Sequence, residues 1–263
     1  MSPLPSFDLQ GLRALVTGGA HGIGLSIAEA LLAQGARVHV CGTQADVLAS
    51  AQKALPALST SVTDITNEAR VAQMFAEIGE RFGGLDILVN NAGIAGPTAA
   101  IEDISLADWQ QCLDVNLTGT FLCTRAAVPG MKQQRSGSII NIGSVASRLA
   151  FPRRTPYSAT KYGVIGLTET WATELGPHGI RVNAILPGIV EGPRQDRVLA
   201  ASAAAAGVSV DKMREQVLQR VSLRRMVSAS EIAAATVFLC SAAGASITGQ
   251  SLSVDGHVET LVR

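Results

Sequence analysis

A short apolar segment that runs directly into a glycine-rich loop and then into a helical segment constrains the fold of this chain most. Residues 12–16 have the pattern of a buried strand, residues 17–24 read Thr-Gly-Gly-Ala-His-Gly-Ile-Gly, and residues 23–34 have apolar positions at helical spacing. Glycine lets the backbone turn tightly and approach a diphosphate, while the unpaired amides at a helix start favour negative charge. The pattern predicts a cradle for a dinucleotide; the alternative is a glycine-rich turn without a ligand.

The rest of the chain alternates short apolar strands with longer helical segments. Such alternation requires right-handed crossovers and produces an α/β fold, with a parallel sheet covered by helices on both faces. Because no linker, repeat or low-complexity segment divides the 263 residues, of which 47% are hydrophobic, we expect a single domain of about seven strands. Further strands are expected at 37–41, 60–63, 85–90, 138–142, 181–186 and 251–254, and helices at 68–82, 108–134 and 157–175.

Charge and cysteine content narrow the class of partner. Lys and Arg number 21, as do Asp and Glu, so no net field attracts nucleic acid or a membrane surface, and we expect a small-molecule partner. No secretory apolar region precedes Phe7 and no apolar run reaches membrane-spanning length, so a cytoplasmic location is expected. The cysteines are widely separated in mostly apolar surroundings, which favours reduced core residues over disulfides or a metal site: Cys41, Cys112, Cys123 and Cys240.

Tyr157 and Lys161 form the second informative motif, in Tyr-Ser-Ala-Thr-Lys. On a helix this spacing puts both side chains on one face, about one turn apart. A phenol is a poor base at neutral pH, but a fixed positive charge nearby favours the phenolate, so Tyr157 is a candidate proton-transfer group. Ser144 lies upstream, in Ile-Asn-Ile-Gly-Ser, where it is a candidate to hold the reacting oxygen. The alternative for the isolated pair is an ordinary surface contact on a helix.

Four motif residues follow predicted strand ends: Thr17, Asn90, Ser144 and Pro187. In open parallel sheets, ligands bind in the crevice at the carboxyl ends of the strands. We therefore expect one crevice to collect all four.

Six motifs in register resemble the short-chain dehydrogenase/reductase family, and the resemblance covers essentially the whole chain. It implies one Rossmann-like, doubly wound domain over residues 1–263, with a small helical substrate lid after Pro187-Gly188, at about 190–225. It also implies an NAD(P)-dependent alcohol dehydrogenase or carbonyl reductase that transfers a hydride between nicotinamide and a secondary alcohol or carbonyl. The motifs are Thr17-Gly18-x-x-x-Gly22-x-Gly24, Asn90-Asn-Ala-Gly93, Asn116, Ser144, Tyr157-x-x-x-Lys161 and Pro187-Gly188.

The resemblance assigns roles to four catalytic residues. Tyr157 is the general acid in reduction and the base in oxidation, and Ser144 hydrogen-bonds the substrate carbonyl. Lys161 favours the phenolate through its charge and binds the cofactor ribose. Asn116 holds a water that relays protons from Lys161; its alternative is a satisfied core amide.

The resemblance also implies which residues hold the cofactor. Asp64 reaches the adenine amino group, unless it caps the helix near Asn67, and the Ile189 backbone meets the nicotinamide carboxamide. Gly192 stands where the family often has a threonine bonded to that carboxamide, which leaves more of the positioning to Ile189. The full set is Thr17, Gly18, His21, Gly22, Ile23, Gly24, Gly42, Thr43, Asp64, Ile65, Asn90, Ala92, Gly93, Tyr157, Lys161, Pro187, Gly188 and Ile189.

The end of the second strand bears on the choice between NAD and NADP. NAD-selective members have an acidic residue there that accepts hydrogen bonds from the ribose hydroxyls, but this chain has Gly42 followed by Thr43. No carboxylate repels a 2′-phosphate, and no Arg or Lys at these positions attracts one. The glycine loop offers only His21, which has the alternative of an ordinary loop residue. We expect dual use of NADP and NAD, leaning to NADP.

Arginines near the expected crevice bear on the substrate. Arg148, Arg153 and Arg154 lie between Ser144 and Tyr157, and Arg194 lies in the expected lid. An arginine fork matches the geometry of a carboxylate, sulfonate or phosphate, so we expect a small anionic substrate. The alternative is that these arginines face solvent.

Alternatives of other classes are a dinucleotide-binding redox sensor without catalysis and an epimerase or dehydratase with bound NAD. The intact catalytic residues disfavour the first, and the short chain disfavours the second. No metal-binding or hydrolase pattern is present in the sequence.

Family members commonly form tetramers through the helices that match 108–134 and 157–175, so we expect a homotetramer or homodimer. Trp109 and Trp171 are candidates for burial there, with the intramolecular core as the alternative.

Overall fold

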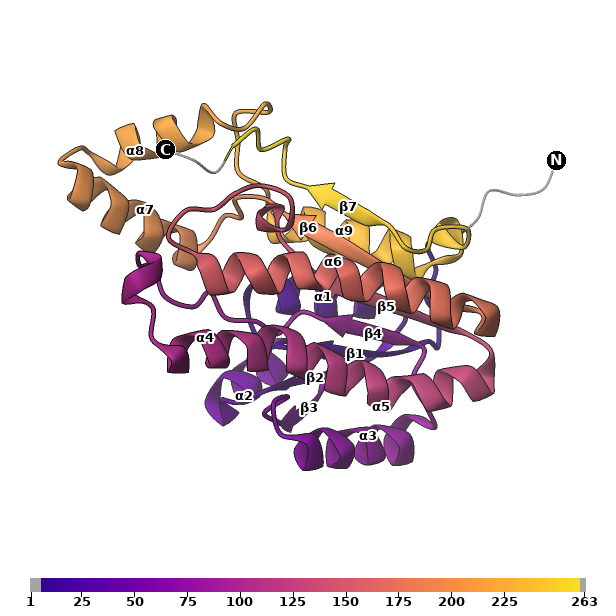
Figure 1. Ribbon diagram of the computed structural model, residues 1–263. Coiled ribbons are helices and arrows are strands. Elements are labelled where there is room, and N and C mark those ends of the chain that lie inside the picture. Colours follow the sequence, from indigo (N-terminus) through magenta and orange to yellow (C-terminus); the bar gives the residue numbers. More distant parts are fainter. Residues whose placement is uncertain (1–5, 261–263) are drawn as a thin grey trace.

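The computed structural model describes residues 6–260, apart from the side chains of residues 194, 201 and 205. Within this range the chain forms a seven-stranded parallel sheet in the order β3-β2-β1-β4-β5-β6-β7 (Figure 1). The order changes direction between β1 and β4, and a crevice forms at the carboxyl ends of the strands at such a point. The strands are β1 (Arg13–Thr17), β2 (Arg37–Gly42), β3 (Ser59–Val62), β4 (Ile87–Asn90), β5 (Gly137–Ile142), β6 (Ile180–Pro187) and β7 (Ser251–Val254).

Helices cover both faces of the sheet. Along β1, Ala14 and Val16 pack against one set of helices and Leu15 against the other, because successive strand residues point to opposite faces. The first face bears α1 (Gly22–Ala33), α2 (Ala45–Ala54) and α9 (Ala229–Cys240), and the second bears α3 (Glu68–Phe82), α5 (Gly119–Gln134) and α6 (Thr155–Leu175), as Figure 1 shows. The predicted α/β fold, a doubly wound parallel sheet flanked by helices, is confirmed.

The helix expected over 108–134 is interrupted in the structure. It begins earlier, as α4 (Leu106–Leu113), because the Ser105 side chain accepts the Asp108 N–H and caps it. A π-helical turn (Asp114–Thr118) then separates α4 from α5. Single π turns inside helices occur frequently at functional sites, and Asn116 stands at the centre of this one.

Two helices lie beyond the end of the sheet to which the β7 arrow points in Figure 1, namely α7 (Pro193–Ala206) and α8 (Val210–Leu218). They share a small apolar cluster of their own, in which Leu199 and Met213 are buried with Met226. Because this cluster is separate from the two main cores, the pair of helices has its own packing unit beside the crevice.

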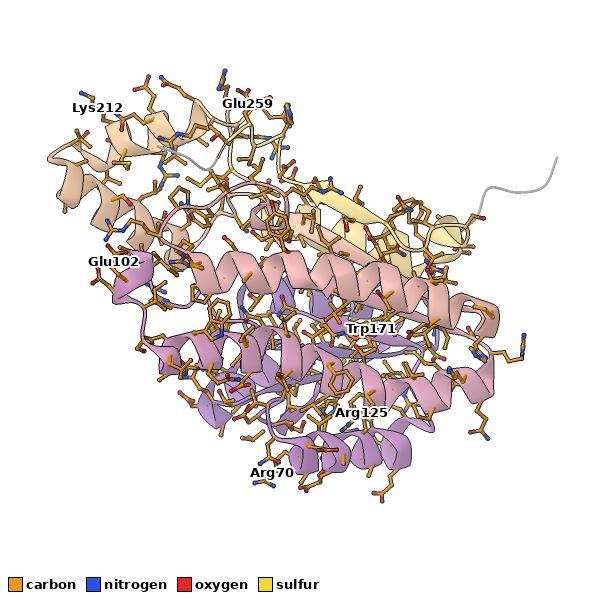
Figure 2. The ribbon with its side chains drawn as sticks, in the orientation of Figure 1. Arg70, Glu102, Arg125, Trp171, Lys212 and Glu259 are labelled. Atoms are coloured by element: carbon orange, nitrogen blue, oxygen red, sulfur yellow. The ribbon has the colours of Figure 1, made fainter. Side chains whose placement is uncertain are left out.

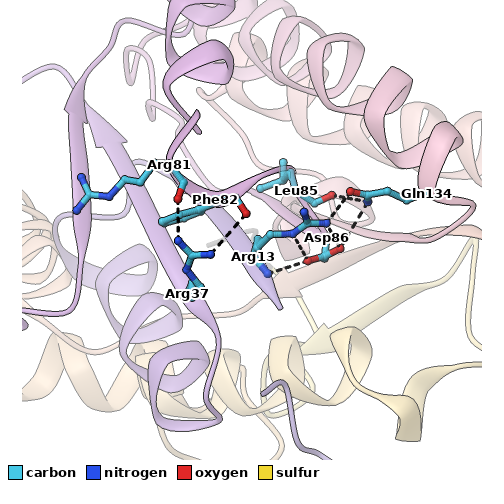
Figure 3. A network of polar contacts seen from close by, with 7 residues as sticks. All are labelled: Arg13, Arg37, Arg81, Phe82, Leu85, Asp86 and Gln134. Carbon is cyan, nitrogen blue, oxygen red and sulfur yellow. Dashed lines mark hydrogen bonds and ion pairs between the residues drawn. The ribbon is translucent and has the colours of Figure 1, made fainter. Parts of the chain in front are cut away.

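A polar network ties the amino end of β1 to the turn before β4 (Figure 3). The Arg13 guanidinium donates two hydrogen bonds to the Asp86 carboxylate, both of 2.7 Å, and also bonds Gln134 of α5. The bond to Asp86 raises the pKa of Arg13. This bidentate pair fixes the two strands that flank the change of direction in the sheet.

All four cysteines are buried, and their thiols are free. Desolvation raises the pKa of both Cys41 and Cys240 to about 12, so these thiols stay protonated and unreactive at neutral pH. In the part of the chain that the structure describes, no helix is both long and apolar enough to cross a membrane.

Candidate active site

Tyr157 and Lys161 lie in the first two turns of α6. The Lys161 Nζ is 5.7 Å from the centroid of the Tyr157 ring, and it donates a hydrogen bond of 2.8 Å to the Ile142 carbonyl at the end of β5. Lys161 is only 7% exposed, so it is not a solvated surface lysine. The helical spacing thus places a buried positive charge beside the phenol, as the proposed proton-transfer role requires.

Ser144 follows the end of β5 and begins a short 3-10 turn. Its Oγ accepts the Ala146 N–H at 3.1 Å, and the Ser147 Oγ accepts the Ser144 N–H in return. This reciprocal cap fixes the serine while using its oxygen only as an acceptor. The Ser144 hydroxyl can therefore still donate its hydrogen to a substrate oxygen.

Asn116 has its side-chain amide fully engaged inside the protein. The Oδ1 accepts the Ile94 N–H at 2.8 Å, and the Nδ2 donates to the Ile94 carbonyl at 3.0 Å and to the Thr160 Oγ1 at 2.9 Å. A Cβ added at Gly93 would lie 3.1 Å from the Asn116 Oδ1 and 3.8 Å from the Lys161 Nζ. Asn116 is thus a satisfied amide, and it also stands next to Lys161 over the Gly93 backbone.

A cysteine with a shifted pKa borders this cluster. Cys112 lies 3.4 Å from the Asn116 Nδ2. Desolvation raises the pKa of the Cys112 thiol, while the bond to Thr160 and the charges of Lys161 and Arg154 act in the opposite direction. The thiol therefore stays neutral, and its sulfur accepts a weak hydrogen bond from Asn116.

The glycine loop has the geometry that a diphosphate requires. Gly18 and Gly22 have φ of +60° and +55°, in the left-handed region that favours glycine. A Cβ at Gly24 would lie 2.3 Å from the Gly18 carbonyl oxygen, whereas one at Gly22 would meet nothing within 4 Å. His21, at the start of α1, makes no side-chain cap, and the first turn has no acidic residue. Open space above uncapped amides fits the phosphates of a dinucleotide.

Thr17 and Asn91 join this loop to the segment after β4. The Thr17 Oγ1 accepts the N–H groups of Asn91 and Ala92, both at 3.0 Å. The Asn91 Nδ2 donates back to the carbonyls of Thr17 at 2.9 Å and Gly18 at 3.0 Å. Asn91 had no separate role in the sequence prediction, although its place in the motif Asn-Asn-Ala-Gly was the available signal.

Asn90 and Ile65, both predicted cofactor residues, have side chains in the core. Asn90 is 4% exposed, and its Nδ2 donates to the Thr124 Oγ1 at 3.0 Å and the Asn141 Oδ1 at 2.9 Å. The Ile65 side chain is buried against Gly119 of α5. The side chains of these two residues therefore do not contact a cofactor, and only their backbones remain for that role.

The ends of β2 and β3 are more open. A Cβ at Gly42 would meet only the Leu48 Cδ2, at 4.0 Å, and Thr43 is exposed. Asp64 is also exposed, and its Oδ1 accepts the backbone and side-chain hydrogens of Thr66. Asn67, rather than Asp64, caps α3, because its Oδ1 accepts the Arg70 N–H at 3.1 Å.

The segment after β6 is held on both sides. The Gly188 N–H donates to the Val254 carbonyl at 3.1 Å, and the Ile189 carbonyl accepts the Val227 N–H at 2.9 Å. Gly192, where the family pattern has threonine, starts α7 with φ of +129°. A residue with a side chain would be strained in that conformation, which explains the departure from the pattern.

Of the predicted substrate arginines with described side chains, the structure brings one to Tyr157. The Arg154 Cζ lies 5.5 Å from the centroid of the Tyr157 ring, and its Nη1 bonds the Thr98 Oγ1. Arg148 instead donates to the Ser251 carbonyl of β7 at 2.7 Å, and Arg153 is exposed with φ of +65°. The side chain of Arg194 lies outside the described part of the chain.

Known proteins resemble this chain over nearly its whole length. The family model described as Enoyl-(Acyl carrier protein) reductase matches residues 18–258. The D-beta-hydroxybutyrate dehydrogenase of Cupriavidus necator is 39% identical over 253 residues, with 94% of this chain and 98% of the relative covered. The gluconate 5-dehydrogenase of Gluconobacter oxydans is 37% identical over 262 residues, with 98% of each covered.

Two solved structures show the same fold. NAD+-bound xylitol dehydrogenase superposes with a TM-score of 0.89 at 30% identity, over 94% of this chain and 98% of that chain. A variant of actinorhodin polyketide ketoreductase with NADPH superposes with a TM-score of 0.90 at 34% identity, over 94% and 97%.

Proposed function

The chain belongs to the short-chain dehydrogenase/reductase family and is an NAD(P)-dependent oxidoreductase of hydroxyl and carbonyl groups, and we propose that its substrate is a small hydroxy acid or the corresponding oxo acid. One observation carries the proposal: two cations lie close to the Tyr157 ring, with the Lys161 Nζ 5.7 Å and the Arg154 Cζ 5.5 Å from its centroid. The first charge serves the proton-transfer group. The second charge, on Arg154, lies on the same ring and is placed to attract the carboxylate of a bound substrate.

The chain's own residues supply orientation and proton transfer. Ser144 donates a hydrogen bond to the substrate oxygen, and the Tyr157 hydroxyl takes the proton from an alcohol or gives it to a carbonyl. The Lys161 ammonium stabilises the phenolate that forms when Tyr157 acts as the base. The nicotinamide of the bound cofactor supplies the hydride chemistry.

The residues from the glycine loop to the segment after β6 would hold the cofactor. The uncapped amides of α1 would bind its diphosphate, and the buried Lys161 would donate to a ribose hydroxyl. Both NAD and NADP are used, with a lean to NADP, because Gly42 at the end of β2 presents no carboxylate to the adenosine ribose. The solved relatives with NAD+ and with NADPH support dual use in this family.

The lid and the assembly complete the proposal. The whole chain, 1–263, acts as one domain, and α7 with α8, within about 190–225, closes over the substrate and excludes water. Two copies, or four, associate through α5 and α6, where Phe121 is 43% and Tyr162 is 49% exposed. The half-buried Trp171 of α6, labelled in Figure 2, is a further candidate for this interface. The free thiols of the buried cysteines support a reducing compartment, the cytoplasm.

A substrate panel tests the hydroxy-acid proposal. Small hydroxy acids and their neutral esters are offered with NAD or NADP while nicotinamide absorbance is followed. We expect the acids to be oxidised with the lower KM. If acid and ester are processed alike, Arg154 belongs to a solvated rim and the anionic substrate is wrong.

Arginine variants locate the anion contact. Arg154→Ala should raise the KM for the acid by ~10- to 100-fold, the size of a hydrogen bond to a charged group, and leave the KM for the ester within about twofold. Arg148→Ala is the matched control, because its guanidinium is bonded to the Ser251 carbonyl rather than directed at Tyr157. If Arg148→Ala changes the acid KM and Arg154→Ala does not, the contact has been assigned to the wrong arginine.

A further inference from the structure

We propose that Thr160 is a positioning residue for the catalytic groups, an inference that rests on the proposed function. Thr160 stands between Tyr157 and Lys161 in the sequence and is completely buried. Its hydroxyl joins the π turn that holds Asn116 to the first turn of α6 that holds Tyr157. Without this link, the two elements that meet at the reacting centre would be held together there by weaker contacts.

The Thr160 hydroxyl uses both of its functions. Its O–H donates to the Tyr157 carbonyl at 2.8 Å, one turn back along α6, and its oxygen accepts the Asn116 Nδ2 at 2.9 Å. A hydroxyl that donates within its own helix has a fixed direction for its remaining lone pairs. Asn116 is therefore held at one distance from the turn that bears Tyr157.

The other end of Asn116 extends the link to the cofactor side of the crevice. Its amide pairs with both backbone groups of Ile94, at 2.8 and 3.0 Å, directly after Gly93. A Cβ placed on Gly93 would lie 3.8 Å from the Lys161 Nζ, so this loop passes close to the ammonium. A single chain of contacts thus runs from the loop after β4, through Asn116 and Thr160, to α6.

Replacing Thr160 by valine removes the hydroxyl and keeps the shape of the side chain. Asn116 is 2% exposed, so water cannot replace the lost oxygen, and the Cys112 Sγ at 3.4 Å, a weak acceptor, is the partner that remains besides the Ile94 carbonyl. The amide must then shift toward another acceptor, and the π turn moves relative to α6. The link through Asn116 would then no longer help to fix the distance between the Lys161 ammonium and the Tyr157 phenol.

Thr168 provides a matched control on the same helix. It is also completely buried, donates to the Val164 carbonyl at 2.7 Å, and accepts the Asn141 Nδ2 at 2.9 Å. Thr168→Val therefore removes a buried hydroxyl with the same two kinds of bond, two turns away from the catalytic groups, whereas Thr160 also bonds the Cys112 thiol. A difference between the two valine variants therefore measures the effect of the place of Thr160 beside the catalytic groups, and not the general effect of losing a buried hydroxyl.

Phenolate formation gives a readout that needs no substrate. The chain has only two tyrosines, so in a Tyr162→Phe background the ultraviolet absorbance of phenolate reports Tyr157 alone. We expect Thr160→Val to move the pH midpoint of this absorbance upward by about half a unit or more, because the ammonium stabilises the phenolate less well. Thr168→Val should leave the midpoint in place, and Thr160→Ser, which keeps the hydroxyl, should restore it.

Turnover gives the second readout. With an active substrate, Thr160→Val should lower kcat roughly tenfold and leave KM within about twofold, because the defect lies in proton transfer and not in binding. Thermal unfolding checks that the variants fold, and Thr160→Ala replaces the valine variant if valine is not tolerated.

The inference needs both readouts. It is overturned if Thr160→Val matches Thr168→Val in midpoint or in kcat, or if Thr160→Ser is as impaired as the valine variant. A wild-type protein that oxidises no alcohol in the panel would count against the proposed function alone, since the titration decides the role of Thr160 without a substrate.

Discussion

The two ends of the crevice are built in different ways. The reacting end is defined by Asn116, Ser144, Tyr157 and Lys161. Two of these side chains are bonded to neighbouring elements, Asn116 to Ile94 and Thr160 and Lys161 to the Ile142 carbonyl. At the ribose end, defined by Gly42, Thr43 and Asp64, Gly42 has no side chain and the other two residues are exposed.

This difference separates chemistry from cofactor choice. Groups held from several sides lose little freedom when substrate binds, which suits proton transfer at a fixed distance. An exposed strand end with few contacts can accept a new side chain without disturbing the core. Substitutions at the reacting end should therefore change turnover, and those at the ribose end should change cofactor affinity.

The largest effect is expected at the reacting end, for Tyr157→Phe. The ring remains for Arg154 and Lys161 to pack against, but the proton-transfer hydroxyl is gone. General acid–base groups typically contribute ~10²- to 10⁴-fold, so kcat should fall by this factor while cofactor affinity, measured by fluorescence titration, is unchanged. Turnover above about a tenth of wild type at saturating substrate would remove Tyr157 from the role of acid.

The fold was predictable because its signals are local and repeated. The strand at 251–254 and the helix at 68–82 were predicted with the bounds that the structure has. Apolar strands between amphipathic helices allow little besides a doubly wound parallel sheet. The break in the helix over 108–134 was not predictable, because a π turn changes the hydrogen-bond pattern without a break in apolar spacing.

The site was predictable in outline and less so in detail. Spacing placed Tyr157 and Lys161 together, and strand ends gathered Thr17 and Ser144 on one edge of the sheet. The direction of a side chain depends on tertiary packing, and sequence proximity does not report it. Arg154 thus contacts Tyr157 while Arg148, in the same loop, binds β7.

Acid should destabilise the strands that carry the ribose end, because His39 lies on β2, the strand that ends at Gly42. Its Nδ1 contacts the Ser59 Oγ at 2.8 Å and its Nε2 the Ser61 Oγ at 2.9 Å, so the buried ring links β2 to β3. Desolvation, and then the charge of Arg81, lowers the pKa of His39 from 6.5 to about 4. Between these values the unfolded chain binds a proton that the folded chain does not. The contribution of neutral His39 to the free energy of unfolding is therefore complete above pH 6.5 and is lost as pH falls toward 4.

Urea unfolding measures this loss. The free energy of unfolding should fall by about 2 kcal/mol between about pH 7 and pH 5 in wild type, and by clearly less in His39→Gln. Glu231 does not confuse the comparison, because its bonds to Arg225 and to the Ser228 N–H lower its pKa to about 2, below this window. Equal losses in wild type and His39→Gln would assign the acid sensitivity to another group.

The smallest effect, and the sharpest test of the contrast, is expected for Gly42→Asp. A Cβ at Gly42 meets only the Leu48 Cδ2, at 4.0 Å, so the side chain fits without strain. The new carboxylate should accept hydrogen bonds from the ribose hydroxyls of NAD and repel the 2′-phosphate of NADP. Because the site is open to solvent, the charge effect is screened, and the ratio of NAD to NADP affinity should rise about tenfold. Gly42→Asn, which offers a similar shape without the charge, is the control. If the aspartate variant changes kcat with both cofactors and leaves the affinity ratio unchanged, then the ribose end is coupled to the chemistry and the two ends of the crevice are not independent.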